Sequence, residues 1–150
     1  MAGLPEYLSR VLLTLWLGGL WVIGYVVAPV LFWKLPDKQL AGNLAGVLFG
    51  IMSWIGMASG FYLLIFRVVR HGARALKQWF FWIVLVMLLM VLGGYFGIQP
   101  VIQHLKQAAL PREVMQSAFA SRFERWHGIA SVIYLIESLL GLLLFREREA

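Results

Sequence analysis

The sequence contains no cysteine and few charged residues, and these two shortages limit what the protein can be. Without cysteine it has no disulfides, thiolate zinc sites, iron–sulfur clusters or covalently attached c-type haem. Charged residues make up 13% and hydrophobic residues 61% of the 150 residues. The mean hydropathy of +0.81 lies outside the usual range of soluble domains, so the composition indicates a membrane protein.

Common catalytic motifs are missing as well. The chain has no GxSxG, HExxH, Walker or GxGxxG pattern. Its three histidines, His71, His104 and His127, have no recognised zinc spacing, and none falls inside an expected span, which argues against bis-histidine haem. We therefore expect neither an enzyme nor a bound metal or cofactor.

Four apolar runs are each long enough to cross a bilayer core, which needs roughly 20 helical residues. They predict transmembrane helices at about 11–33, 44–66, 79–98 and 128–145, with an outer segment at 99–125. The second helix is expected to begin near Gln39. Pro100 should kink or end the third helix, and Pro111 suits the first turn of the fourth. The sequence thus predicts one all-α domain over 1–150, an integral membrane antiparallel four-helix bundle.

Basic residues suggest how this bundle is oriented. The side that holds both termini and the second connection carries seven Lys and Arg residues, counting Arg148, and the other side carries six. Four of the seven fall within residues 67–77, a density that places both termini in the cytoplasm. Since the basic residues flank apolar runs, anionic lipids explain them better than nucleic acid does. We expect a multi-pass protein of the inner (plasma) membrane.

Small residues recur along the second predicted helix. At 100° per residue they fall within a sector of about 120°. Small residues four apart let helices approach closely in lipid, so this helix is expected to be the buried spine of the bundle, although a groove for a lipid or flat ligand is the alternative. The helix-packing positions are Gly42, Gly46, Gly50, Ser53, Gly56 and Gly60.

A single carboxylate, Glu137, lies at the centre of the fourth predicted helix. Helical spacing puts Ala130, Tyr134, Gly141 and His127 on its face, which should point into the bundle. A charged residue at this depth costs about 2.5–3.5 kcal/mol on insertion scales, and no basic residue is available there to pair with it. Either a neutral Glu137 sets helix register by hydrogen bonding, or it binds a cation, a proton or a polar group of a ligand.

Several other side chains at similar depth are able to hydrogen-bond a carboxyl group or line a pocket beside it. Ser53 and Ser59 belong to this set, and the deep tryptophan Trp16 is a further candidate for a pocket wall. The predicted binding residues are Glu137, His127, Tyr134, Trp21, Tyr25 and Trp54.

Three stretches are similar to a known family: LWLGGLWVIGYVVAPVLF, AGNLAGVLFG and FERWHGIASVIYLIESLLGL. They resemble the transmembrane protein 205-like family, whose bacterial members are four-span proteins of unknown function. The layout is also distantly like copper-resistance membrane domains, but this chain lacks their histidines within spans. The resemblance implies the four-helix fold and directs attention to the mouth of the fourth helix. The matching positions are Trp16, Gly18, Gly19, Ala28, Pro29, Leu31, Phe32, Ala41, Gly42, Gly46, Phe49, Phe123, His127, Gly128 and Ser131.

Two functions fit these observations. The first is a membrane protein that binds, or helps to move, a cation or a small polar or amphipathic molecule through an outward-facing cleft near Glu137 and His127. The second is a structural or assembly protein whose glycine stripe packs helices or a partner subunit. In both cases the expected partners are membrane lipids and either a second copy or another membrane protein.

Overall fold

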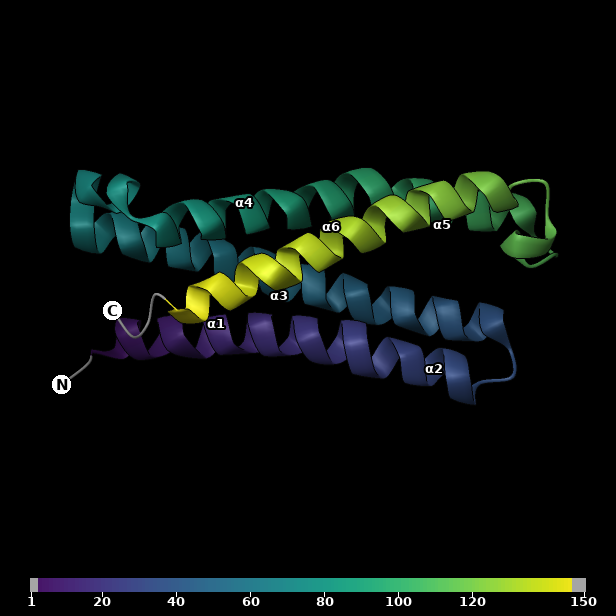
Figure 1. Cartoon of the computed structure of the whole chain (residues 1–150), viewed down its shortest axis with the longest axis horizontal. Coiled ribbons are helices and arrows are strands. Elements are labelled where there is room, and N and C mark those ends of the chain that lie inside the picture. Colours follow the sequence, from purple (N-terminus) through teal and green to yellow (C-terminus); the bar gives the residue numbers. More distant parts are fainter. Residues whose placement is uncertain (1–2, 147–150) are drawn as a thin grey trace.

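A computed structural model describes residues 3–146, so Arg148 lies outside the described residues. Four long helical stretches run back and forth along one axis, and the first begins at the same end of the bundle at which the fourth finishes (Figure 1). Within the described chain there are no strands. The elements are α1 (Leu4–Val22), η1 (Ile23–Val27), α2 (Ala28–Lys34), α3 (Lys38–His71), η2 (Gly72–Lys77), α4 (Trp79–Gly93), η3 (Gly94–Ile98), α5 (Gln99–Ala109), η4 (Val114–Gln116) and α6 (Ala120–Arg146).

The predicted all-α bundle is confirmed. Four helical stretches are long and apolar enough to span a membrane, at Leu4–Lys34, Lys38–Lys77, Trp79–Ala109 and Ala120–Arg146. Their outer faces expose large apolar side chains such as Val69, which is 81% exposed. A soluble monomer rarely exposes so large an apolar surface, so the chain has the architecture of a multi-pass membrane protein.

Two helix boundaries differ from the sequence-based expectation. Of the two effects expected at Pro100, a kink or an end, the end does not occur, and the third helical stretch continues to Ala109 because a π-helical turn, η3, ends two residues before the proline. A wider turn relieves the clash between the proline ring and the preceding carbonyl groups. The fourth long helix begins at Ala120 rather than near Pro111, and only the short turn η4 forms between them. The second helix begins at Lys38, one residue before the expected Gln39, where the Asp37 side chain caps it.

The first and third helical stretches share this device. The π-turn η1 contains Gly24-Tyr25 and precedes Pro29, and η3 begins with Gly94-Tyr95 and precedes Pro100. Each turn lets a proline-containing helix continue along the length of the bundle. The two tyrosines therefore sit at matching places in two different helices.

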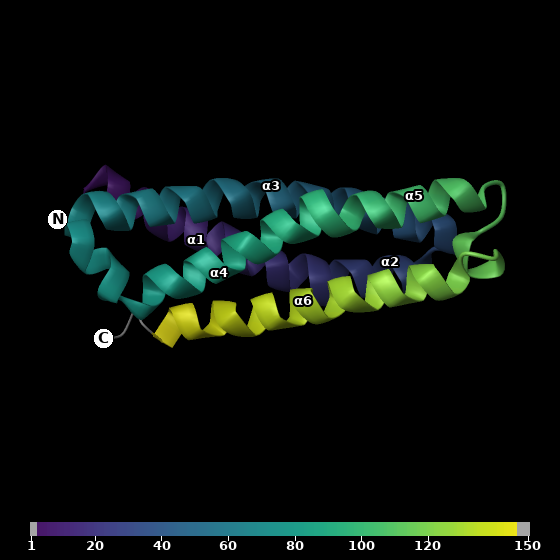
Figure 2. The same ribbon diagram turned by 90° about the horizontal axis from the view of Figure 1, so that it is seen from above.

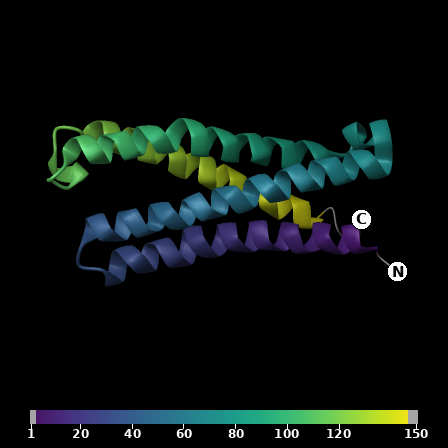
Figure 3. The ribbon, with the colours of Figure 1, turned by 180° about the vertical axis from the view of Figure 1, so that it is seen from behind.

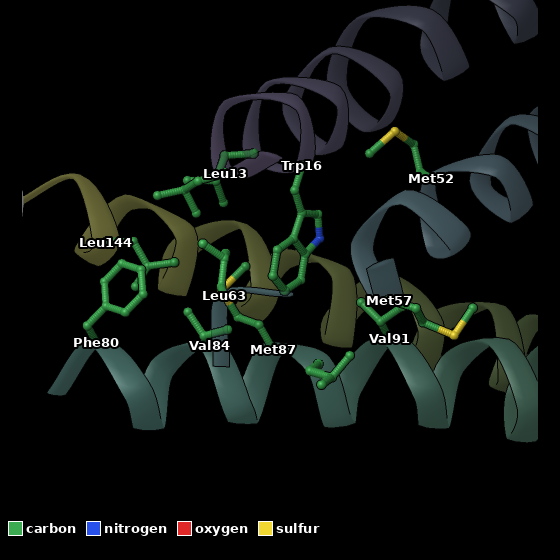
Figure 4. Packing of buried hydrophobic residues seen from close by; sticks show 12 residues of the cluster. Leu13, Trp16, Met52, Met57, Leu63, Phe80, Val84, Met87, Val91 and Leu144 are labelled. Atoms are coloured by element: carbon green, nitrogen blue, oxygen red, sulfur yellow. The ribbon is translucent and has the colours of Figure 1, made fainter. Parts of the chain in front are cut away.

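Apolar packing is concentrated in the half of the bundle near the chain ends. Figure 4 shows Trp16 extending from α1 towards α3 and α4, among side chains of all four long helices. Trp16, Leu63, Val84 and Leu144 are each at most 1% exposed. This end of the bundle is therefore a close-packed core.

The opposite half is splayed. α3 lies beside α4 near η2 but crosses to lie beside α2 at the other end, which Figure 3 shows from behind. There α2 packs on α3 and α5 packs on α6, and no extensive contact joins the two pairs. Figure 2 shows the same end from above, with the connection between α5 and α6. The space between the two pairs is where a cavity forms.

Candidate ligand-binding cavity

A cavity of about 730 Å³ lies between the α2–α3 pair and the α5–α6 pair. Apolar side chains line most of its wall, and Glu137 and Lys106 are among the charged residues that line it. Trp16, Met52, Val91 and Glu137 mark the inner end, where the close-packed core begins. Because the core fills the remaining half, the cavity is a pocket with a closed floor.

Glu137 is the acidic group of that floor. It is 5% exposed and lines the cavity from α6. The indole N–H of Trp16 approaches its carboxyl group from α1. Its Oε1 atom, however, has no hydrogen-bond partner among the residues that the structure describes. A buried polar atom left unpaired is costly, so a hydrogen-bond donor that reached this oxygen would stabilise the site.

The polar side chains expected around Glu137 make other bonds. Tyr134 lines the cavity, but its hydroxyl donates to the backbone carbonyl of Leu20. Tyr25 also lines the cavity, and its hydroxyl donates to Ser138 Oγ at 2.8 Å, while Ser138 donates in turn to the Tyr134 carbonyl at 2.7 Å. These bonds tie the first helical stretch to the fourth. Trp16 is therefore the side chain that hydrogen-bonds the Glu137 carboxyl group.

The two other predicted aromatic residues lie outside the cavity wall. Trp54 is 57% exposed and donates its indole N–H to the Tyr95 hydroxyl at 3.1 Å. Trp21 packs its ring against Tyr25, with ring centroids 5.2 Å apart, and its buried indole nitrogen has no partner in the described chain. Both tryptophans support residues of the wall, Tyr95 and Tyr25, rather than forming it.

The small residues of α3 divide into two groups. A Cβ at Gly56 would lie 2.8 Å from Trp16 Nε1, and one at Gly60 would lie 3.0 Å from Leu88 Cδ1, so these two glycines permit close helix packing. At Gly46 the nearest atom would be Gln103 Nε2 at 3.7 Å, which is ordinary contact. Gly42 and Gly50 also lack a crowded neighbour, and Ser53 hydrogen-bonds within its own helix. Gly42 and Ser53 line the cavity together with Gly46, and Gly50 does not.

The expectation of one continuous buried spine is therefore wrong for the outer half of α3. There the missing side chains widen a cavity instead of admitting a helix. Sequence spacing alone does not distinguish these uses, because both require small residues four positions apart.

His127 stands at the mouth, on the edge of α6. Its ring stacks on Phe123, with centroids 5.6 Å apart and planes 8° apart, and both residues line the cavity. The Lys106 ammonium lies 6.0 Å from the Phe123 ring centroid. Lys106 and Phe123 were not among the predicted binding residues, since nothing in the sequence signals that α5 continues far enough to bring Lys106 to this cavity.

Metal binding has little support from the side chains present. No three His, Cys, Asp or Glu residues cluster within residues 3–146. His104 does not line the cavity, so it does not join His127 there. The cavity instead offers a long apolar wall, an acid at the floor and a base at the mouth, which together suit an elongated organic molecule.

Comparison with known proteins gives one match. Residues 11–111 match the family described as a domain of unknown function (DUF4149). No curated protein and no solved structure matches the chain at a significant level. The matched region begins within α1 and ends just after α5. The likeness to transmembrane protein 205 and to copper-resistance domains stays a prediction.

Proposed function

The chain belongs to this family of unknown function, and we propose that it is a membrane protein that binds an amphipathic molecule in the cavity. The ligand's apolar body would lie along the wall, and a hydroxyl or amine group at its inner end would donate a hydrogen bond to Glu137. Binding rather than catalysis is the proposed role.

The unpaired Oε1 atom of Glu137 carries this proposal. The side chain is 5% exposed and lines a cavity of about 730 Å³, and its partnerless oxygen is itself buried, so a small rotation of the carboxyl group would bring this oxygen to a donor in the cavity. Intramembrane acids are expensive and tend to mark functional sites. A hydroxyl or amine donor would satisfy the oxygen while keeping water out.

The shape of the cavity supports an elongated ligand over a small ion. Glu137 follows His127 by ten residues, which corresponds to roughly 15 Å along a helix. A metal ion at the floor would find no group of three His, Cys, Asp or Glu side chains among the described residues. An amphipathic molecule instead contacts the apolar wall throughout that depth.

The closed floor favours holding a molecule over conducting one. Beyond Trp16 the bundle is filled by Leu17, Met87 and Leu144, each at most 1% exposed. Any movement of a ligand would therefore be exchange at one side of the membrane. The basic second connection favours an orientation in a bacterial-type inner membrane with both termini on the cytoplasmic side. In that orientation the mouth of the cavity opens towards the outer side.

The assembly alternative keeps one supporting observation. Gly56 and Gly60 admit close packing, as an assembly protein would need, but their neighbours Trp16 and Leu88 belong to the same chain. This packing explains how the bundle holds together and leaves the unpaired Glu137 oxygen without a role. A partner subunit stays a prediction.

The test is thermal unfolding of the purified full chain in mild detergent with hexadecanediol or hexadecylamine as probes. We expect at least one probe to raise the unfolding midpoint of the wild type and not that of Glu137→Gln, because the amide presents a competing donor in place of an oxygen. The variant itself should fold, since Gln has nearly the same shape.

Ser59→Ala is the matched control. Ser59 is also fully buried with a partnerless hydroxyl among the described residues, but it does not line the cavity. Its variant should respond to the probes as the wild type does. Equal responses of the wild type and Glu137→Gln, or no response to either probe, would show that Glu137 is not a ligand-binding group.

A further inference from the structure

A basic residue lies at the end of the cavity opposite Glu137. Lys106 projects from α5 into the mouth, where its Nζ would be 3.8 Å from a Cβ at Gly42 and is 6.0 Å from the Phe123 ring centroid. It is half-buried and has no ion-pair partner among the described residues. Glu113 also lines the mouth but does not pair with it. The absence of a side chain at Gly42 leaves room for the ammonium group.

The other lysine of the mouth already has partners. Lys38 Nζ donates to the backbone carbonyls of Phe32 and Leu35 and so closes the turn between α2 and α3. Lys106 is thus the mouth lysine whose ammonium group is available to an anion. Burial in an apolar wall strengthens such an interaction because little water competes for the charge.

We propose that Lys106 holds an oxyanion headgroup, a phosphate or a carboxylate, at the mouth of the cavity, and that the ligand enters from the bilayer between α2 and α6. The inference rests on the proposed function and specifies its ligand, which is a long-chain oxyanion with a second polar group at its inner end. The headgroup binds Lys106 and the inner group binds Glu137.

The lateral opening follows from residues that both line the cavity and are exposed. They form two stripes at helical spacing, one on each side of the gap. No extensive contact joins α2 to α6, whereas Tyr25 and Tyr134, with ring centroids 6.0 Å apart, close the gap at its inner end. On the opposite side of the cavity Gln103 and Lys106 reach across to the glycines of α3. The stripes are Tyr25, Pro29 and Phe32 facing His127, Ser131 and Leu135.

This opening suits a lipid-like ligand. The two stripes that border it carry mainly apolar and aromatic groups, and in the membrane they face acyl chains rather than water. A molecule with an apolar chain crosses such a gap without leaving the hydrocarbon, while its charged head stays at the level of Lys106 near the membrane surface. The route therefore agrees with the position of the headgroup site.

Binding of omega-hydroxyhexadecanoate, compared with hexadecanediol, tests the headgroup site. The two probes share the chain and the hydroxyl, and only the first carries an anion. We expect Lys106→Gln to weaken binding of the hydroxy acid about tenfold or more, as loss of a hydrogen bond to a charged group does. The affinity for the diol should not change. Lys106→Arg should restore tight binding of the acid. Lys77→Gln, at the other end of the bundle, should have no effect.

Hexadecanoate and hexadecyl phosphate distinguish the source of the anion. Tighter binding of hexadecyl phosphate identifies a phospholipid-like head, and tighter binding of hexadecanoate identifies a fatty-acid head. Equal affinities of Lys106→Gln and wild type for both anions would overturn the headgroup site. If the diol still binds through Glu137 in that case, the proposed function stands without the inference, and if no probe binds at all, both are wrong.

Cysteine labelling tests the lateral route, because the chain has no cysteine of its own. Ser131→Cys is loaded with omega-hydroxyhexadecanoate and then coupled to a bulky thiol reagent. We expect ligand release to slow relative to Leu139→Cys treated in the same way. Leu139 is 52% exposed on the same helix but does not line the cavity. Equal or faster release from the labelled Ser131→Cys protein would overturn the lateral route.

Discussion

The Trp16 indole lies directly against Gly56, so closely that a Cβ at position 56 would come within 2.8 Å of the indole nitrogen. This contact fixes the ring that forms the cavity floor and approaches Glu137. The glycine thus contributes to the site without touching the cavity's acid. It links the close packing of one half of the bundle to the geometry of the hollow half.

Gly56→Ala should therefore affect both stability and binding. Moving a large ring in a packed core costs about 1–3 kcal/mol, and the shift of Trp16 should weaken binding of hexadecanediol. Thermal unfolding and probe binding measure the two effects. Gly18→Ala is the control, because a Cβ there meets nothing within 4 Å. If Gly56→Ala behaves like Gly18→Ala, the floor is not held by this contact.

Leucine substitutions should separate the two groups of α3 glycines. Gly60→Leu places side-chain atoms onto Leu88 and should destabilise the fold by about 1–3 kcal/mol or more. Gly46→Leu points into the cavity, so the protein should fold with nearly wild-type stability while losing space for hexadecanediol. Unfolding midpoints and probe affinity of both variants test this. A strong destabilisation by Gly46→Leu would instead support the interpretation of α3 as one continuous helix-packing stripe.

Tyr134→Phe removes the hydroxyl that donates to the Leu20 carbonyl. We expect a loss of about 0.5–1.5 kcal/mol, because the bond lies inside the bundle, where water does not replace it, although the Leu20 carbonyl still accepts the Ile23 N–H. Tyr62→Phe removes a similar 3.0 Å bond to the Pro5 carbonyl at an exposed site and should cost less. Unfolding of both variants in detergent gives the comparison, and a larger loss for Tyr62→Phe would contradict this account of the bond.

Much of the fold was predictable from hydropathy. The four apolar runs identify the four helices because a backbone in lipid must satisfy its own hydrogen bonds. The ends of the helices were less predictable. Pro100 predicted a kink or an end of the third helix, and only the preceding π-turn shows how the helix continues past it. That turn depends on packing between helices, which no single apolar run reveals.

The site was partly predictable for the same reason. Helical spacing predicted that His127, Tyr134 and Glu137 share one face, since that argument needs α6 alone, and all three line the cavity. Trp21 and Trp54 were chosen by depth alone, and depth does not tell which way a side chain points. Lys106 was missed because its position depends on how far the third helix continues.

The most direct test asks whether a chain in the cavity reaches the floor beside Glu137. In a variant that keeps Trp16 and replaces every other tryptophan with phenylalanine, fluorescence reports on that floor. Trp16 is 1% exposed, so surrounding detergent does not contact it. A brominated long-chain hydroxy acid should quench this fluorescence, and Glu137→Gln should reduce the quenching at equal probe concentration. Unquenched Trp16 at saturating probe would contradict the proposal that this cavity is a ligand-binding site.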